Sequence, residues 1–455
     1  MMLLSRILLI TSLYTLQGFL SGLKTSIPLY LASYKASWQE QGTFSWVLYP
    51  FSIKILWAPI LDSIYVNRLG PHLTWLIPIQ VSIGLLLIVL SYYIESLLKN
   101  LEIYSLTSIF FVIYFLIASQ DIVVDGWSIL LFSDSNLQWS STCQIIGQVI
   151  GTFFGSTFLL TFESANFTNR FIRRPLSLCE HSSGLFTLEQ FTYSIGLIFL
   201  FVSFILVLII LTRKSSNHDS VNSKRKKFVV METYLSIYKL FQKKSVRQLA
   251  WILFTFGFGF AATSHMTMLT LIDNGLTRDT LSLLNLPLIC VNILVPLCMS
   301  NIRHPLRWFS RIYLPQLFGC LILAIYVHKT PLFIDKSYYY PMLILVLCLN
   351  ETMVFIMVAS RMGFCARISE PRIAGTYMTL LATISNLGYS LSSTFIFYTA
   401  EYLPKTLAYP IEVGFCLLIG LVWINCFSKT IHHLGELPIE QWYLKPIESM
   451  TVKYM

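Results

Sequence analysis

The segment Ser119–Trp127 reads SQDIVVDGW and follows directly on the apolar run Ile103–Ala118, which reads IYSLTSIFFVIYFLIA. Together they are long enough to cross about 30 Å of hydrocarbon as one α-helix. Asp121 and Asp125 are four residues apart, so a helix places both on one face. A carboxylate costs about 2.5 to 3.5 kcal/mol at the centre of a membrane helix, so it usually faces a partner or a water-filled path. We therefore predict a membrane helix whose acidic face, with Gln120 beside it, lines a cavity.

Similar apolar runs continue along the whole chain. Of its 455 residues, 55% are hydrophobic and only 12% charged, and the sequence divides into about twelve stretches long enough to cross a bilayer. This composition predicts an all-α polytopic membrane protein with the lipid bilayer as a partner. The predicted spans are 3–23, 42–61, 75–94, 103–124, 142–162, 191–212, 249–272, 281–300, 312–328, 341–360, 373–399 and 409–427.

Basic residues set the expected orientation. Lys and Arg are retained on the cytoplasmic side of membranes, and placing both termini in the cytosol puts most of the 32 Lys and Arg residues on that side. We therefore predict a multi-pass protein with both termini cytosolic. The net charge of +10 is then a consequence of topology, and no nucleic-acid partner is predicted.

The longest polar stretch is basic and falls between the sixth and seventh predicted spans. It divides the chain into two parts with the same number of spans. The predicted parts are an N-terminal half (1–212), a basic cytosolic linker (213–248), a C-terminal half (249–427) and a cytosolic tail (428–455).

Two prolines in the second predicted span, Pro50 and Pro59, recur at the same spacing as Pro287 and Pro296 in the eighth. Such a trace is typical of transporters built from two parallel repeats, although proline is frequent in membrane helices and coincidence explains it equally well. Two six-helix halves around a central cavity are the architecture of the major facilitator class, in which rocking of the halves gives alternating access. We predict this fold class, with about twelve transmembrane helices.

Lys54 lies in the middle of the second predicted span, and it is the one basic residue at depth within the predicted spans. An ammonium group there would bind an anionic substrate group or pair with Asp121 or Asp125, because snorkelling to the interface is strained at this depth. Two carboxylates on one face do not both ionise cheaply in a low dielectric, so we expect one to be paired and the other to carry a coupling proton. The alternative is a structural salt bridge that fixes helix packing.

Two further acidic residues are candidates. Glu351 in the tenth predicted span is a second possible proton carrier, since a carboxyl group in a low dielectric is readily neutralised. Asp62 at the end of the second span is expected in a gating loop rather than on the substrate.

The fifth predicted span carries two polar and three small residues at helical spacing. Gln144 and Gln148 are one turn apart, so they could offer amide groups to the cavity or hold helices together. Gly147, Gly151 and Gly155 repeat every four residues, and this spacing predicts a close approach of two membrane helices.

Five segments taken together resemble one known family. They are GLKTSIPLYLASY (Gly22–Tyr34), FSWVLYPFSIKILWAPILDSIYVNRLG (Phe44–Gly70), SQDIVVDGW, STCQIIGQVIGTFFG (Ser141–Gly155) and ISEPRIAGTYMTLLATISNLG (Ile368–Gly388). They are similar to segments of the acetyl-coenzyme A transporters of the endoplasmic reticulum, a branch of the major facilitator superfamily. The resemblance implies a secondary transporter that moves acetyl-coenzyme A (acetyl-CoA) from the cytosol into the lumen, by exchange for coenzyme A or with proton coupling.

The chain also departs from the family pattern, with a shortened loop at about 401–410 before the last span and two altered motifs. It has GPHLTW at 70–75 where the family usually has a basic GRRKSW, and NLGYSLSST at 386–394 where the family has NLGGxxPST. A changed substrate preference is therefore an alternative, with another bulky anion or a muropeptide-like solute as cargo.

If acetyl-CoA is the cargo, the C-terminal half offers groups that suit it. A polar stripe with an adjacent aromatic ring would bind its hydroxyl and amide groups, and arginines at the cytosolic mouth would receive its phosphates. The alternatives are hydrogen bonds between helices and ordinary basic flanking. The stripe consists of Thr376, Tyr377, Thr379, Thr383 and Asn386, and the mouth arginines are Arg361, Arg367 and Arg372.

Enzyme chemistry has little support in the sequence. We find no P-loop, GxSxG elbow or HExxH motif, so no catalytic residue is predicted. A membrane-bound acyltransferase that uses acetyl-CoA is the remaining enzymatic alternative, with His181 or His265 as its candidate residue. Neither a cofactor nor a metal site is predicted, because the cysteines and histidines lack metal-ligand spacing.

Overall fold

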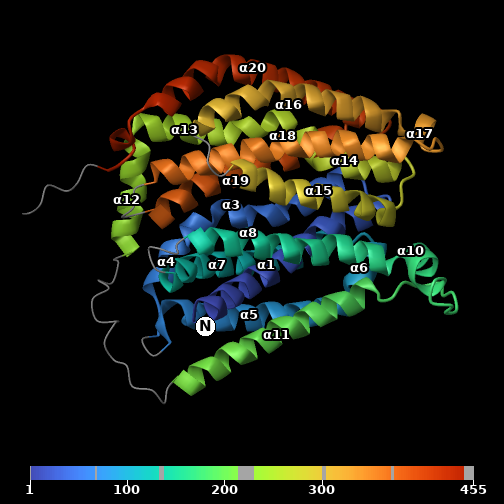
Figure 1. The fold of residues 1–455 in the computed structure, drawn as a ribbon, viewed down its shortest axis with the longest axis horizontal. Coiled ribbons are helices and arrows are strands. Elements are labelled where there is room, and N and C mark those ends of the chain that lie inside the picture. Colours follow the sequence, from blue (N-terminus) through green and yellow to red (C-terminus); the bar gives the residue numbers. More distant parts are fainter. Residues whose placement is uncertain are drawn as a thin grey trace, which may run out of the picture.

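The computed structural model describes residues 2–66, 69–132, 138–213, 230–299, 304–369 and 374–444. All secondary structure in these residues is helical, and Figure 1 shows the long helices lying side by side along the length of the molecule. This confirms the predicted all-α class.

Eleven helical runs in the described part of the chain are long and apolar enough to cross a membrane. Two of them contain irregular turns: α8 and α9 are joined by the π-helical segment η4 (Phe153–Phe158), and α13 and α14 by the 3₁₀ segment η6 (Phe256–Phe260). The spanning helices are α1 (Met2–Ser33), α5 (Gly70–Ser91), α7 (Ile103–Leu131), α8 (Gln138–Thr152) with α9 (Leu159–Glu163), α11 (Leu188–Arg213), α13 (Lys244–Thr255) with α14 (Ala261–Asp273), α15 (Arg278–Met299), α16 (Pro305–His328), α18 (Tyr339–Ile368), α19 (Ala374–Ala400) and α20 (Ala408–Glu436).

The predicted second span is the exception, because no single long helix covers it. Proline lacks a backbone donor and clashes with the preceding turn, and the backbone departs from regular helix geometry at Ile53 (φ −125°, ψ 8°) and Trp57 (φ −120°, ψ −4°). The stretch folds as α2 (Trp38–Phe44), η1 (Ser45–Leu48), α3 (Tyr49–Ile53), η2 (Lys54–Leu56) and α4 (Ala58–Ser63). The proline pair of the eighth span has no such effect, since α15 is one continuous helix.

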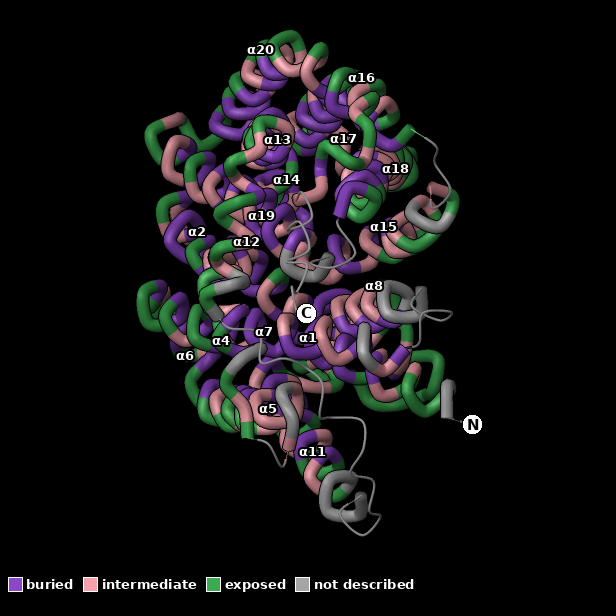
Figure 2. Tube along the Cα trace, turned by 90° about the vertical axis from the view of Figure 1, so that its left-hand side faces the viewer, coloured by how far each residue is buried: buried purple, intermediate pink, exposed green. Residues whose placement is uncertain are grey.

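The helices form two groups, which Figure 2 shows in a view along the bundle. α5, α7, α8 and α11 lie on one side, and α13, α16, α18 and α20 on the other. The first group belongs to the N-terminal half of the chain and the second to the C-terminal half, so the molecule has the two-half architecture that the sequence predicts.

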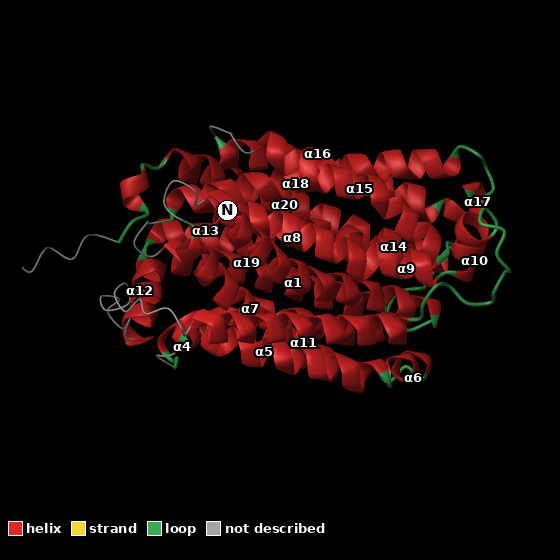
Figure 3. Ribbon diagram, turned by 60° about the horizontal axis from the view of Figure 1, so that its bottom comes forward, coloured by secondary structure: helices red, strands yellow, loops and turns green. Residues whose placement is uncertain are grey.

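Short helices mark the two ends of the bundle, and Figure 3 shows them in a third view. We call one end the loop end, where α6 (Ile94–Lys99), α10 (Ala165–Thr168) and α17 (Thr330–Phe333) lie, and the other the α12 end, after α12 (Val230–Gln242). α12 lies within the predicted linker. It packs against α4 of one half and against α13 and α19 of the other.

The glycines of the fifth span bring α1 and α8 together closely. A Cβ atom added at Gly151 would lie 2.1 Å from the carbonyl oxygen of Thr15 and 2.6 Å from the Cα of Gly18. One added at Gly155 would lie 2.1 Å from the carbonyl oxygen of Phe19. The predicted close approach is confirmed, because only a residue without a side chain fits at these crossings.

Hydrogen bonds join the two halves along two seams. In the α19 seam, residues of α2, η1 and α3 bond to α19, and Ser45 Oγ lies 2.8 Å from Thr394 Oγ1. In the α15 seam, Thr161 Oγ1 donates to Ser282 Oγ at 2.9 Å, and Ser164 Oγ donates to Asp279 Oδ2 at 3.0 Å. Both residues of the N-terminal half in this second seam lie at the loop end of the fifth span, so the halves are held together at the loop end.

Candidate functional site

The ion pair of Lys54 and Asp121 is the centre of a buried network in the N-terminal half. Lys54 is the first residue of η2, where the second span unwinds. Its Nζ lies 2.5 Å from Asp121 Oδ2, and the two side chains are only 8% and 5% exposed. Gln17 Nε2 on α1 donates to the other oxygen, Oδ1, at 2.7 Å. Both oxygens of Asp121 are therefore used inside the protein.

Asp125, one turn further along α7, has different partners. Its Oδ1 accepts a hydrogen bond from the Tyr14 hydroxyl at 2.5 Å and one from Gln144 Nε2 at 3.3 Å. Within the described residues no Lys, Arg or His forms an ion pair with it. Asp121 is thus charge-compensated, whereas Asp125 is held by neutral donors. We refer to Gln17, Tyr14, Lys54, Asp121, Asp125 and Gln144 as the acidic network.

The two remaining glutamine candidates do not join this network. Gln120 is buried against α1, where its Nε2 donates to the carbonyl oxygen of Leu13 at 3.4 Å, and its Oε1 has no hydrogen-bond partner among the described residues. It therefore lies in the packing between α1 and α7 rather than on an open surface. Gln148 is half-buried on α8.

Lys24 is a second basic residue at depth, which the sequence analysis placed just past the first span. α1 continues without interruption to Ser33, so the spanning segment is Leu4–Ser33 and Lys24 lies inside it. The expectation that Lys54 is alone at depth is therefore wrong. The missed signal is the apolar continuation SIPLYLAS after Lys24, which is too apolar to be a loop.

Lys24 differs from Lys54 because no carboxylate neutralises it. Among the residues that the structure describes, its ammonium group forms no ion pair, and its Nζ lies 6.0 Å from the centroid of the Tyr114 ring. The side chain is half-buried. α1, which carries Lys24, packs against α14 of the C-terminal half, which carries His265.

His265 belongs to a group of polar side chains where the two halves meet. Its ring centroid lies 4.5 Å from that of Tyr389 on α19, and its Nε2 is buried without a hydrogen-bond partner in the described part of the chain. Tyr389 is 47% exposed, and α19, which carries it, packs on α18, which carries Glu351. Glu351 is half-buried and has no described ion-pair partner. We call Lys24, His265, Glu351 and Tyr389 the inter-half layer.

The polar stripe of the eleventh span is only partly assembled. Thr383 is buried with an Oγ1 that finds no hydrogen-bond partner among the described residues, and Thr379 and Asn386 are half-buried. Tyr377, in contrast, is fully buried in a hydrophobic core of the C-terminal half. The side chain of Thr376 lies outside the described residues.

Two of the arginines predicted at the mouth, Arg361 and Arg367, lie on the last turns of α18. Arg361 Nη1 donates to the hydroxyl of Ser385, and its guanidinium carbon lies 4.9 Å from the centroid of the Phe256 ring. No described acidic residue forms an ion pair with Arg361, and Arg367 is exposed. Arg372 and the side chain of Asp62 lie outside the described residues.

A cluster at the loop end, absent from the sequence analysis, connects the halves. The Tyr30 hydroxyl donates to Glu163, and Arg278 of the other half lies with Nη1 3.9 Å from Glu163 Oε2 and its guanidinium carbon 4.2 Å from the centroid of the Tyr30 ring. Glu163 and Arg278 also line a cavity of about 900 Å³ between the halves, together with Lys35, Asp273 and Lys405. We call Tyr30, Glu163 and Arg278 the latch.

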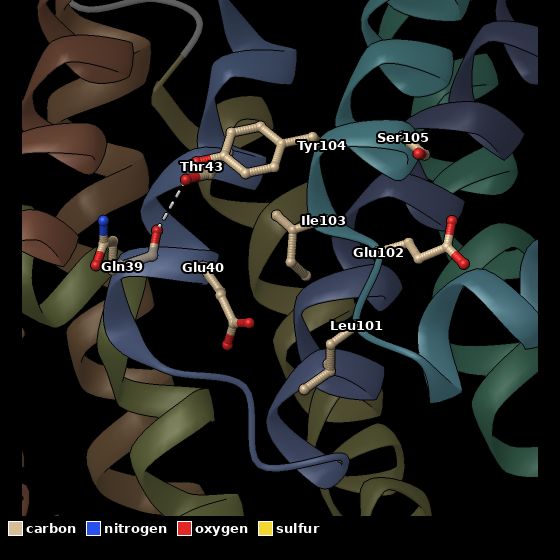
Figure 4. A pocket seen from close by; sticks show the side chains of 8 residues that line it. All are labelled: Gln39, Glu40, Thr43, Leu101, Glu102, Ile103, Tyr104 and Ser105. Carbon is tan, nitrogen blue, oxygen red and sulfur yellow. Dashed lines mark hydrogen bonds between the residues drawn. The ribbon is translucent and has the colours of Figure 1, made fainter.

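A smaller pocket lies within the N-terminal half and outside this arrangement. It measures about 310 Å³ and is lined by Gln39, Glu40 and Thr43 of α2 and by residues 101–105, as Figure 4 shows. Thr43 Oγ1 donates to the carbonyl oxygen of Gln39 at 3.1 Å. None of the predicted site residues lines it.

The geometry defines a membrane protein with uncompensated charges between two helical halves, which is how secondary transporters place their sites. The fold agrees with that class. A crystal structure of a major facilitator superfamily transporter, FucP, in the outward conformation superposes with a TM-score of 0.54 at 14% identity, covering 92% of this chain and 98% of that chain. The fold is therefore that of the major facilitator class.

The family follows from the sequence comparison. The model described as acetyl-coenzyme A transporter 1 matches residues 6–305 and 302–408, and the chain belongs to this family. An uncharacterized protein of Schizosaccharomyces pombe is 32% identical over 83% of this chain and 71% of its own length. An uncharacterized membrane protein of Saccharomyces cerevisiae is 27% identical over 95% of this chain and 96% of its own length.

Proposed function

We propose that this protein carries acetyl-CoA across the endoplasmic reticulum membrane into the lumen, by alternating access of its two halves. Family membership and fold support a membrane transporter. The observation that carries the substrate assignment is the presence of two basic residues, Lys24 and Arg361, that lack a carboxylate partner in the described part of the chain. Acetyl-CoA supplies several phosphate charges for such groups, and an unpaired cation inside a membrane protein calls for an anion.

In the proposed orientation the α12 end faces the cytosol and the loop end faces the lumen. The α15 seam and the latch close the loop end in this state. Acetyl-CoA would then enter from the α12 end past Arg361 and Arg367, and its release would require that Arg278 separate from Glu163 as the halves rock.

Two carboxyl groups are available for coupling, and they define two versions of the mechanism. Asp125 is held only by neutral donors, and Glu351 lacks an ion-pair partner among the described residues. Either could take up and release a proton during the cycle, as proton-coupled transporters require. Exchange of acetyl-CoA for coenzyme A requires neither carboxyl group to carry a proton.

The experiment is uptake of labelled acetyl-CoA by the purified protein in proteoliposomes without any acyl acceptor. We expect saturable uptake that unlabelled acetyl-CoA inhibits and short peptides do not. Preloading the vesicles with coenzyme A tests exchange, and an imposed pH gradient tests proton coupling. Absence of uptake, with acetyl transfer seen only after an acceptor is added, would favour an acyltransferase. If short peptides inhibit uptake and unlabelled acetyl-CoA does not, the muropeptide-like alternative is favoured.

A further inference from the structure

We infer that Lys24, together with His265 and Tyr389 of the opposite half, forms an anion subsite that binds a phosphate group of the transported molecule. This inference rests on the proposed function for the identity of the molecule, but the subsite itself is defined by the chemistry of the three side chains. It assigns the substrate-binding charge to Lys24 and not to Lys54.

Charge compensation distinguishes the two lysines. Lys54 has Asp121 at 2.5 Å, and that carboxylate is also bonded to Gln17, so the pair is complete without a ligand. Lys24 has no acidic partner in the described residues, and the nearby ring of Tyr114 offers only a weak cation–π contact. A half-buried ammonium group without a counter-charge is costly in a membrane protein. An anionic ligand would remove this cost.

Two helices of the C-terminal half supply hydrogen-bond groups for an anion with several oxygens: α14, which packs on α1, and α19, which packs on α14. The Nε2 of His265 is buried and has no hydrogen-bond partner in the described part of the chain. Tyr389 packs on the His265 ring with 4.5 Å between centroids and keeps 47% of its surface exposed. An ammonium group, an imidazole and a phenol hydroxyl can each donate to a phosphate oxygen. A phosphate group has enough oxygens to use all three at once.

The subsite joins the two halves, so occupancy is linked to their arrangement. Lys24 belongs to α1 of the N-terminal half, whereas His265 and Tyr389 belong to α14 and α19, which pack on each other. Tyr30 of the latch follows Lys24 by six residues on α1, which is about 9 Å along the helix. A phosphate group at Lys24 would therefore lie directly below the closed loop end.

The test is binding of phosphate-bearing and phosphate-free probes to the purified full-length protein. The probes are acetyl-CoA, adenosine 3′,5′-bisphosphate and acetyl-pantetheine, which lacks the phosphates. We expect Lys24→Met to weaken binding of the first two by at least about tenfold, the order expected for one charge-assisted contact, and to leave acetyl-pantetheine unchanged. Lys24→Arg should retain most of the affinity. The matched control is Lys329→Met, which removes an exposed lysine at the loop end.

A second measurement does not depend on the variant's folding. An amine-acylating reagent is applied to the parent protein with and without adenosine 3′,5′-bisphosphate, and modification is mapped by mass spectrometry. The bisphosphate should protect Lys24 and leave Lys329 reactive. Unchanged affinity in Lys24→Met, or equal modification of Lys24 with and without the probe, would overturn the subsite. Binding of the bisphosphate through Lys24 without any binding of acetyl-CoA would keep the subsite and reject the proposed substrate.

Discussion

The acidic network and the inter-half layer contain similar side chains but differ in whether the lysine is neutralised by a carboxylate. Each has a lysine, a carboxylate and a tyrosine. In the acidic network Lys54 and Asp121 neutralise each other inside one half, and Gln17 donates a hydrogen bond to Asp121. In the inter-half layer Lys24 and Glu351 have no ion-pair partner among the described residues.

This difference separates a structural role from a binding role. A completed buried ion pair contributes little net stability but is strongly destabilising when one partner is removed. Unpaired charges within a membrane protein are retained at a cost, so they indicate a ligand or a proton path. We therefore expect changes to the Lys54–Asp121 pair to act mainly on folding, and changes to Asp125 or to the inter-half layer to act mainly on transport.

The largest effect is expected for Asp121→Asn. This change leaves the Lys54 ammonium group buried with 8% exposure and without its ion-pair partner, and breaking a buried pair costs about 3 to 5 kcal/mol. We expect a large loss of unfolding free energy, measured by chemical or thermal unfolding of the detergent-solubilised protein.

The double variant Lys54→Met with Asp121→Asn is the control for this interpretation. It removes both charges, so it should be more stable than Asp121→Asn alone. If the double variant is less stable than Asp121→Asn, Lys54 and Asp121 do not neutralise each other as the geometry indicates. The structural role assigned to this pair is then wrong.

A smaller effect on stability is expected for Asp125→Asn. The amide oxygen can still accept hydrogen bonds from Tyr14 and Gln144, so we expect a loss of about 1 kcal/mol, the value of one weakened hydrogen bond. Uptake is the informative measurement. If Asp125 carries the coupling proton, its amide variant should lose the pH dependence of uptake while it still folds.

Glu351→Gln is the matched variant in the inter-half layer. It has no described ion pair to break, so its stability should equal that of the parent. Loss of pH dependence in Glu351→Gln but not in Asp125→Asn would move proton coupling to the inter-half layer. An unchanged pH profile in both variants would leave exchange as the mechanism.

Much of the fold could be predicted from the lengths of the apolar runs alone. The length of each run indicates a membrane helix, and the glycine spacing of the fifth span predicted the tight crossing of α1 and α8. The unwinding at Lys54 could not be predicted from proline spacing, because the same spacing leaves α15 continuous. Whether a proline breaks a membrane helix depends on the neighbours that satisfy the released backbone groups.

The site was harder to predict because partners come from distant parts of the chain. Sequence spacing places Asp121 and Asp125 on one face, but it does not show that Gln17 and Tyr14 of α1 reach them. The depth of Lys24 was hard to predict for a different reason, because a charged residue commonly marks the end of a membrane span. A lysine within an apolar run instead indicates a buried charged group that needs an anionic partner or ligand.

The smallest effect is expected at the exposed ion pair of Lys99 and Glu95 on α6, which tests whether burial is the decisive variable. These side chains are 56% and 42% exposed, and exposed pairs contribute little because water screens them. The hydrogen bond from Lys99 lowers the pKa of Glu95, so any contribution is present above the ordinary pKa of the carboxyl group and disappears as the pH falls through the lowered one. Lys99→Ala should therefore leave the melting temperature at pH 7 within error of the parent. A loss as large as that of Asp121→Asn would show that the lysine–carboxylate pair itself, and not its burial, sets the energy of the acidic network.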